Sequence, residues 1–166
     1  MTPHPDANAI ALNCAVITVS DTRTTETDQS GQIIQQLLTD AGHQIVIYTI
    51  VQDEPEEIKT WLSKLDTNAE IGIIILNGGT GIAPRDTTYD VVSDWLETTI
   101  PGFGEIFRWL SYQEIGSRAI ASRAVAGIKN QKLIFSLPGS SNAVKLAMTQ
   151  LILPELNHLV KQIRTH

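Results

Sequence analysis

The 166-residue sequence has a single cysteine, Cys14, so no disulfide can form within the chain, and nothing in it indicates an oxidising compartment. Its four histidines are scattered, which argues against a zinc site. No apolar run approaches the ~20 residues that a membrane-spanning helix needs. No basic segment followed by an apolar one opens the sequence, as a signal peptide would. We therefore expect a soluble, cytoplasmic protein with no membrane partner.

Charged residues make up only 18% of the chain, and the formal net charge is −6. The acidity lies in the first half: residues 1–83 hold three basic and eleven acidic side chains, whereas residues 84–166 hold nine basic and seven acidic ones. The basic residues are dispersed and not interleaved with aromatic ones, so we expect no nucleic-acid partner. A negative field also slows the approach of small anions, so an anionic ligand would need local attraction.

Length and composition favour one globular unit, because 166 residues is close to the roughly 150 typical of a single domain. Hydrophobic residues make up 42% of the chain, enough for a core. Prolines and polar residues at the start predict a flexible N-terminal tail over residues 1–10. We assign residues 11–166 to a single domain.

Three nearly continuous apolar runs rich in β-branched residues are typical of strands buried on both faces of a parallel sheet. They span residues 14–19, 45–51 and 71–76. Helical patterns separate them, and this alternation predicts right-handed βαβ units. The expected fold class is therefore α/β, a three-layer α/β/α architecture with a mostly parallel sheet.

The helical patterns carry their own end signals. Gly42 is placed to end the first helix at its C-terminus. In the second helix, Asp53 is a candidate N-cap with Glu56 three residues later, and Pro55 is tolerated in the first turn.

The second half predicts a mixture of short elements. Residues 124–128 and 132–136 read as two strands joined by a turn short enough for a β-hairpin. Residues 142–164 have apolar residues at helical spacing, and Pro154 should kink or divide that helix. Shorter helices are expected over residues 88–96, 103–110 and 115–121.

Chemistry is expected in the loops after the strands, because ligands of open parallel sheets bind beyond the carboxyl ends. Residues 77–81, Asn-Gly-Gly-Thr-Gly, follow a buried strand, and their glycines allow backbone N–H groups to turn towards an anion. The loop lacks the Lys-Ser/Thr of a Walker A motif, and Pro84 replaces the third glycine of a dinucleotide-binding motif. Its composition favours a phosphate cradle, and a tight turn without ligand is the alternative.

Two charged residues follow this loop. Arg85 offers a bidentate donor to phosphate, and Asp86 offers a hard oxygen ligand to Mg²⁺. If Asp53 lies on the same rim of the sheet, the two carboxylates would suit a Mg²⁺ ion that carries a nucleotide phosphate. The alternative for Asp53 is a plain helix cap.

Two further loops carry weaker signals. Residues 20–22, Ser-Asp-Thr, are equally good turn formers. Pro138, Gly139 and Ser140 add backbone N–H groups and a hydroxyl at the start of a helix, where a simple N-cap is the alternative.

Taken together, the motifs of residues 14–154 are specific to one family. They are Val19-Ser20-Asp21, Asp28-x-Ser30-Gly31, Asp53-Glu54, the glycine loop with Arg85-Asp86, Pro-Gly-Phe-Gly-Glu at 101–105, Ser122-Arg123-Ala124, and Leu-Pro-Gly-Ser at 137–140. The sequence resembles the molybdenum cofactor biosynthesis proteins of the MogA and MoaB type, and residues 107–116 and 122–127 are similar to the MoaB branch.

This resemblance implies adenylyl transfer. The terminal phosphate of molybdopterin attacks the α-phosphate of ATP, which gives adenylylated molybdopterin and pyrophosphate and requires Mg²⁺. Some MoaB-type members lack the Arg-Asp pair after the glycine loop and are thought inactive, whereas this chain has Arg85 and Asp86.

The resemblance also implies the site residues. Asp53, Asp86 and Arg85 would be catalytic, and Asp53 and Asp86 would hold Mg²⁺. The residues that would bind ATP and molybdopterin are Ser20, Asp21, Asp28, Ser30, Gly31, Gly78, Gly79, Thr80, Gly81, Pro138, Gly139 and Ser140.

The expected partners are the two substrates, other proteins of the molybdenum cofactor pathway and further copies of the chain, in a homotrimer or homohexamer. Two alternatives to the enzyme stay open. One is a molybdopterin-binding or carrier protein without catalysis. The other is a structural protein whose glycine loops are only turns and which acts through its oligomer surface.

Overall fold

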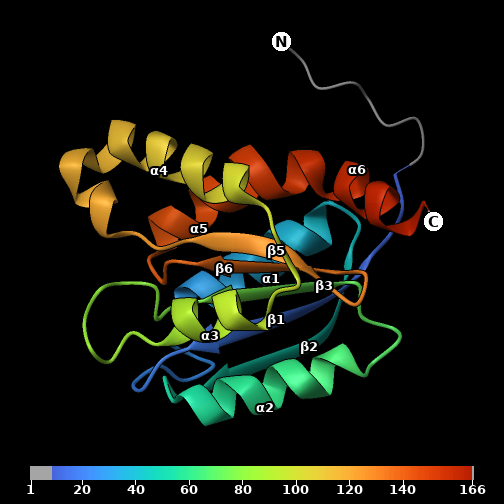
Figure 1. The fold of residues 1–166 in the computed structure, drawn as a ribbon, viewed down its shortest axis with the longest axis horizontal. Helices are drawn as coiled ribbons and strands as arrows, with labels where there is room; N and C mark the ends of the chain where they lie inside the picture. Colours follow the sequence, from blue (N-terminus) through green and yellow to red (C-terminus); the bar gives the residue numbers. More distant parts are fainter. Residues whose placement is uncertain (1–8, 166) are drawn as a thin grey trace.

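A computed structural model describes residues 9–165 and places a six-stranded sheet at the centre of the molecule (Figure 1). The strand order is β2-β1-β3-β6-β5-β4. Strands β2, β1, β3 and β6 are parallel, and β5 and β4 continue the sheet in antiparallel pairing. The strands are β1 (Asn13–Val19), β2 (Gln44–Val51), β3 (Ile73–Asn77), β4 (Thr98–Thr99), β5 (Val125–Lys129) and β6 (Lys132–Leu137).

Helices cover both faces of this sheet and complete three layers (Figure 1). Helices α2 and α3 pack on one face, and α1, α4, α5 and α6 pack on the other. The predicted α/β/α class, with its mostly parallel sheet and its β5–β6 hairpin, is confirmed. The helices are α1 (Gln29–Asp40), α2 (Pro55–Asp66), α3 (Thr88–Trp95), α4 (Pro101–Ile115), the 3₁₀ helix η1 (Gly116–Ala121), α5 (Ser141–Ala147), the π-helix η2 (Met148–Ile152) and α6 (Leu153–Arg164).

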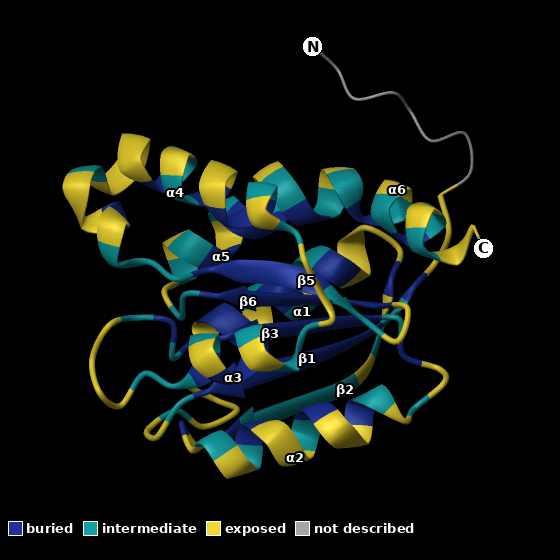
Figure 2. Ribbon diagram, in the orientation of Figure 1, coloured by how far each residue is buried: buried dark blue, intermediate teal, exposed yellow. Residues whose placement is uncertain are grey.

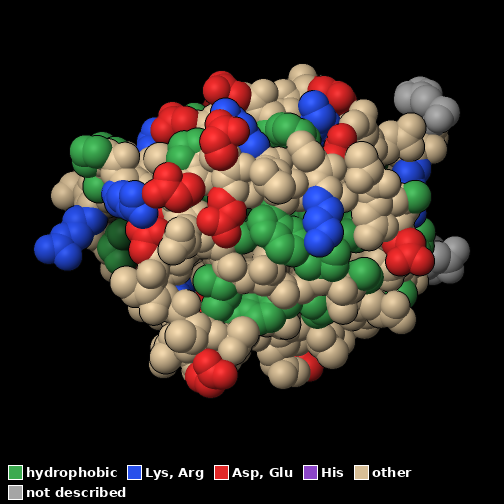
Figure 3. All heavy atoms as spheres, turned by 90° about the horizontal axis from the view of Figure 1, so that it is seen from below, with side chains coloured by type: hydrophobic (Ala, Val, Ile, Leu, Met, Phe, Trp, Pro, Cys, Tyr) green, Lys and Arg blue, Asp and Glu red, His purple; other side chains and the backbone are tan. Residues whose placement is uncertain are grey.

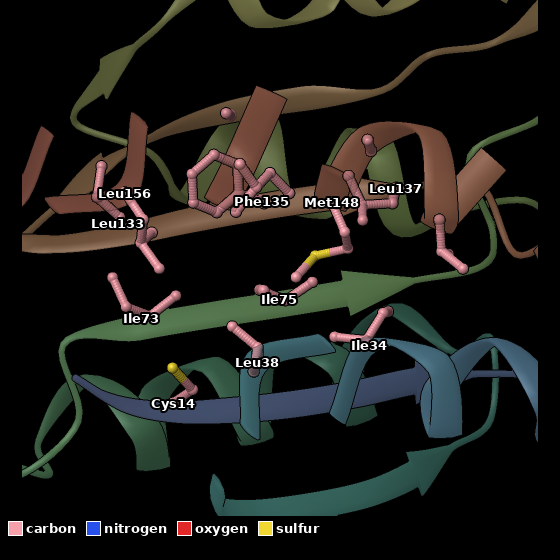
Figure 4. Packing of buried hydrophobic residues seen from close by; sticks show 14 of the residues in the cluster. Cys14, Ile34, Leu38, Ile73, Ile75, Leu133, Phe135, Leu137, Met148 and Leu156 are labelled. Atoms are coloured by element: carbon pink, nitrogen blue, oxygen red, sulfur yellow. The ribbon is translucent and has the colours of Figure 1, made fainter. Parts of the chain in front are cut away.

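Two apolar cores lie on either side of the sheet, because successive strand residues point to opposite faces. Cys14 and Val16 face the core under α1 and α5, whereas Ala15 and Ile17 face the core under α2, and all four are fully buried. Figure 2 shows the buried strands between helices whose outer faces are exposed. Figure 4 shows side chains of the core on the α1 side, with Leu38 of α1 drawn between the ribbons of β1 and β3. The apolar runs of β1 and β3 therefore fill both cores. The prediction that residues 45–51 are buried on both faces is wrong, because β2 lies at the edge of the sheet, where Val51 is buried but Val46 is 40% exposed.

Several local predictions can be compared with the structure. Gly42 follows α1 with a φ of +87°, which confirms its part in the C-terminal cap. Pro154 lies in the first turn of α6, directly after η2, so the helical segment is divided where the sequence indicated. The N-cap prediction for Asp53 is wrong, because Glu54 precedes α2 and makes no side-chain cap. The predicted tail lies mostly outside the described residues, at positions 1–8.

Among residues 9–165, no helix combines the length and the apolar character needed to cross a bilayer. On the face seen in Figure 3, acidic and basic side chains are interspersed, and the described residues show no continuous basic patch there. Burial raises the pKa of the Cys14 thiol to about 12, which fits a core residue rather than a nucleophile.

Candidate functional site

A cavity of about 500 Å³ lies at the carboxyl ends of the parallel strands. These strand ends are on the left of Figure 1. Four segments far apart in the sequence line it: residues 19–23 after β1, 78–86 after β3, 118–122 around the end of η1, and 138–139 after β6. Three of these segments follow parallel strands that are neighbours in the sheet. The cavity therefore lies where ligands of open α/β sheets bind.

Glycines let the loops after β1, β3 and β6 meet closely at the floor of this cavity. Gly78 and Gly79 have φ values of +101° and +67°, which side chains rarely adopt. A Cβ on Gly78 would collide with the carbonyl of Val19, and one on Gly139 would lie 3.2 Å from the Cα of Gly78. The Gly78 N–H donates to the Leu137 carbonyl at 2.9 Å. The glycine-rich sequence thus serves close approach of the backbone, as expected of a loop that receives a ligand.

Arg123, between η1 and β5, holds the glycine loop in place. Its guanidinium donates to the Gly81 carbonyl from Nε at 3.0 Å and from Nη2 at 2.7 Å, and Nη2 also donates to the Asp86 carbonyl at 3.1 Å. Its Nη1 forms an ion pair with Asp90 at 3.1 Å. Arg123 therefore fixes both ends of the 81–86 segment, a positioning role that no local pattern in the sequence indicates.

Asp53 lies beside the cavity and is buried, with 7% of its surface exposed. Its Oδ1 accepts hydrogen bonds from the N–H of Thr87 at 3.1 Å and from the Thr87 hydroxyl at 2.6 Å. Burial raises the pKa of Asp53, the carboxylates of Asp86 and Asp21 raise it further, and the bonds from Thr87 oppose that rise. The surroundings of Asp53 therefore disfavour the negative charge of its ionised form.

These groups fit a divalent cation. Asp53 Oδ2 has no hydrogen-bond partner among the described residues, and the buried Thr88 hydroxyl has none either. Both oxygen atoms lie so close to Gly79 that a Cβ on this residue would collide with them. Within residues 9–165 no three His, Cys, Asp or Glu side chains converge on one point. The protein could therefore supply only part of a metal ion's shell, and Mg²⁺ often takes one or two carboxylates and completes its shell with water and substrate phosphates.

Arg85 does not line the cavity. Its side chain, 61% exposed, donates to Asp21 Oδ2 from Nε at 2.9 Å and from Nη2 at 2.8 Å, and to Glu54 from Nη1 at 2.9 Å. The hydrogen bonds from Arg85 hold the pKa of Asp21 below its usual range. Asp21 Oδ1 in turn accepts the Asp53 N–H at 3.1 Å. Arg85 thus links the loops after β1, β2 and β3 at the rim of the site.

The predicted residues at the start of α1 lie behind the cavity. Asp28 is fully buried and caps α1, since its Oδ1 accepts the Gly31 N–H at 3.0 Å. Its Oδ2 accepts the hydroxyl groups of Thr18 at 2.5 Å and Tyr48 at 2.6 Å. Burial and the bond to Asp28 raise the pKa of Tyr48 well above its ordinary value. Asp28 therefore anchors the start of α1 to the sheet.

Ser30 connects this buried network to the cavity wall. Its hydroxyl accepts from Arg23 Nη1 at 2.6 Å and donates to Asn77 Oδ1 at 2.8 Å. Arg23 also donates to the Gly139 carbonyl at 2.9 Å and lines the cavity. The start of α1 thus shapes the wall through Arg23.

The structure brings part of the predicted set onto the cavity wall. Ser20, Gly78, Gly79, Thr80, Gly81, Asp86, Pro138 and Gly139 line it, whereas Asp21, Asp28, Ser30, Gly31, Asp53, Arg85 and Ser140 do not. Ser140 instead caps α5, because its Oγ accepts the Ala143 N–H at 3.2 Å. Sequence reasoning missed Arg23 and Arg118, which line the cavity as isolated residues without a motif of recognisable chemistry. It gave no site role to Ser122, which also lines the cavity, although Ser122 belongs to one of the family motifs.

The fold and this cavity define a three-layer α/β protein with a glycine-lined pocket at the carboxyl edge of its sheet. Residues 15–158 match the family described as a probable molybdopterin binding domain, and the chain belongs to that family. The resemblance found in the sequence motifs is thereby confirmed.

Relatives and solved structures agree with this assignment. The chain is 56% identical over 153 residues to the molybdenum cofactor biosynthesis protein B of Halalkalibacterium halodurans, which covers 92% of this chain and 90% of that protein. The Bacillus subtilis protein of the same name is 51% identical over 154 residues, with 92% and 91% covered. A crystal structure of a molybdenum cofactor biosynthesis protein B superimposes with a TM-score of 0.92 at 46% identity, covering 95% of this chain and 98% of that one. The tungsten cofactor synthesizing protein MoaB from Pyrococcus furiosus gives 0.84 at 34% identity, with 95% and 99% covered.

Proposed function

We propose that this protein acts in molybdenum cofactor biosynthesis and adenylylates molybdopterin. An oxygen of the terminal phosphate of molybdopterin forms a bond to the α-phosphorus of ATP, and the bond from that phosphorus to the β-phosphate oxygen breaks, releasing pyrophosphate. The observation that carries the proposal is the glycine-lined cavity with Asp86 on its wall and Asp53 beside it, in a chain of this family. The names of the relatives support the pathway.

The chain's own residues would mainly bind and orient the substrates. Backbone N–H groups of the loops at 78–81 and 138–139 can donate to phosphate oxygens, as glycine-rich loops after strands do elsewhere. Arg123 keeps the 81–86 segment in one conformation before the substrates arrive. Nucleotidyl transfer depends mostly on such positioning and on charge neutralisation, so it needs no protein nucleophile.

Asp53 and Asp86 would hold Mg²⁺ in this proposal. When bound, the ion would act as a Lewis acid that neutralises phosphate charge. Burial and neighbouring carboxylates disfavour ionised Asp53, and the hydrogen bonds from Thr87 compensate only in part, so a cation at this place would stabilise the carboxylate further. The Thr87 hydrogen bonds meanwhile fix one oxygen of Asp53 and leave the other available.

We also propose that the chain assembles as a homotrimer or homohexamer and cooperates with other proteins of the pathway. On α4, Phe103 and Phe107 belong to the core, whereas Trp109 and Tyr112 are 61% and 60% exposed. Ile106 and Ile115 add to this exposed apolar face. Aromatic residues are enriched at protein interfaces, so this exposed face of α4 supports the proposed assembly. Light scattering measures the mass of the assembly directly.

The test is an assay for pyrophosphate release with Mg²⁺, ATP and purified molybdopterin. The proposed enzyme releases pyrophosphate only when all three are present. The pairing of Arg85 with Asp21 and Glu54, away from the cavity, is the one feature that favours a carrier without catalysis. A carrier would bind molybdopterin in a calorimeter and release no pyrophosphate, whereas a purely structural protein would bind neither ligand.

A further inference from the structure

The segment around the end of η1 forms one wall of the cavity and carries polar groups that the proposed reaction does not yet use. Arg118, Ala121 and Ser122 line the cavity from this wall. The other walls of the cavity are loops that follow parallel strands. This wall instead follows the helices α4 and η1 and precedes β5.

Arg118 is an available cation of the cavity. Within residues 9–165, three charged side chains line the cavity: Arg23, Asp86 and Arg118. Arg23 is already engaged by Ser30, by the carboxylate of Asp28 and by the Gly139 carbonyl. Arg118 is exposed and has no hydrogen bond or ion pair with any residue between 9 and 165. Its guanidinium is therefore free to pair with an anion that enters the cavity.

The same wall holds a second donor. The Ser122 hydroxyl is buried and has no partner within the described part of the chain. A buried hydroxyl without a partner is costly in a folded protein, and such groups are uncommon unless a ligand or water satisfies them. An unpaired cation and an unpaired hydroxyl thus lie four residues apart on one wall.

This wall is held rigidly enough to present them. The next residue, Arg123, is bonded to the glycine loop through Gly81 and Asp86, and its own N–H donates to the Thr80 carbonyl at 3.2 Å. Ala119 is buried within η1 itself. Binding groups on a fixed backbone lose less entropy when a ligand arrives, so the wall is prepared for recognition.

We infer that the η1 wall is a second anion subsite, in which Arg118 and Ser122 bind a phosphate group. The inference rests on the proposed function, which places two phosphate-bearing substrates in one cavity. The glycine loops with Asp53 and Asp86 account for one set of phosphates, and a second set needs its own positive charge in a chain of net charge −6. The phosphate is either that of molybdopterin or part of the ATP triphosphate, and an arginine fork suits both.

The test compares Arg118→Gln and Arg118→Lys with Lys145→Gln. Lys145 is an exposed cation on α5 that does not line the cavity, so its variant makes the same change in net charge. Isothermal titration calorimetry measures binding of Mg-ATP and of molybdopterin separately, and thermal unfolding verifies that each variant folds. Arg118→Gln should weaken one of the two ligands by about tenfold to a hundredfold, because a charge-assisted hydrogen bond to phosphate is lost.

The ligand that weakens identifies the source of the phosphate. Arg118→Lys should retain part of the affinity, Ser122→Ala should weaken the same ligand by about threefold or more, and Lys145→Gln should bind like the wild type. Wild-type affinity of Arg118→Gln for both ligands, in a protein that still adenylylates molybdopterin, overturns the subsite and leaves the proposed function standing. Selective weakening by Arg118→Gln in a protein that never releases pyrophosphate supports the subsite and overturns the catalysis. Failure of the wild type to bind either ligand overturns both.

Discussion

The guanidinium of Arg85 donates two hydrogen bonds to one oxygen of Asp21, from Nη2 at 2.8 Å and from Nε at 2.9 Å. The other oxygen of Asp21 accepts the N–H of Asp53 at 3.1 Å. Asp21 therefore connects Arg85 to Asp53. Arg85 does not line the cavity, whereas Asp53 lies beside the cavity. From this connection we expect Arg85 to influence the site through Asp21.

A double-mutant cycle tests this connection. In the pyrophosphate-release assay, Asp21→Ala and Arg85→Gln should each lower kcat by about tenfold, because Asp53 is positioned less well. If Arg85 acts only through Asp21, adding Arg85→Gln to Asp21→Ala should change kcat no further. A large additional loss in the double variant, or an effect of Arg85→Gln far above that of Asp21→Ala, would mean that Arg85 contacts the substrate itself.

The buried Asp28 network predicts a stability effect. Asp28→Ala removes the cap of α1 and leaves the hydroxyl groups of Thr18 and Tyr48 without their acceptor. We expect a loss of about 3 kcal/mol in the free energy of unfolding, and a Tm lower by roughly 6–12 °C in a chain of this size. Differential scanning calorimetry measures both, and Glu70→Ala, at an exposed position, is the matched control. An unchanged Tm together with lost ligand binding would instead assign Asp28 to the ligand.

His43 predicts a pH dependence of stability away from the site. Its Nδ1 accepts the N–H of Leu12 at 3.2 Å, and burial lowers the pKa of this imidazole below its ordinary value of 6.5. As the pH falls below about 6.5, the unfolded chain binds a proton that the native imidazole resists, so the folded state loses stability. Above that pH both states carry a neutral imidazole, and the contribution is fully present.

Asparagine at this position keeps an acceptor but does not titrate. The Tm of His43→Asn should therefore fall less than that of the wild type between about pH 7 and pH 5. His158→Gln, at an exposed position, should follow the wild type. Equal slopes for wild type and His43→Asn would show that this histidine titrates alike in the folded and unfolded states.

Much of the fold could be predicted because its signals are local. The apolar runs of β1, β2 and β3 and the glycine after α1 each state their structure within a few residues. The strand β4 was not predicted, since two residues contain no periodicity. Pro154 indicated that the last helix is divided. The sequence did not indicate that residues 148–152 form a π-helix, because that form depends on how these residues pack.

The candidate site was predictable only in part, because its contacts join distant residues. The glycine loop could be predicted from its local composition. The hydrogen-bond partner of Asp53 could not, because this partner is Thr87, 34 positions away. That long-range bond overrode the local preference of aspartate for a helix cap. Arg123 reaches Gly81 across 42 positions, and Arg118 lies in a short helix without any motif. Such residues acquire their roles only when the sheet brings four segments together.

The central claim is that two carboxylates at this cavity support adenylyl transfer. The most direct measurement is Mg²⁺-dependent pyrophosphate release from ATP in the presence of molybdopterin, for wild type, Asp86→Ala and Asp53→Ala. As a control, Asp94→Ala changes an exposed aspartate on α3 that does not line the cavity. We predict release by the wild type and the control, and a loss of roughly a thousandfold in both site variants, which should still fold. Full activity in Asp86→Ala or Asp53→Ala, or no release by the wild type, would contradict the account.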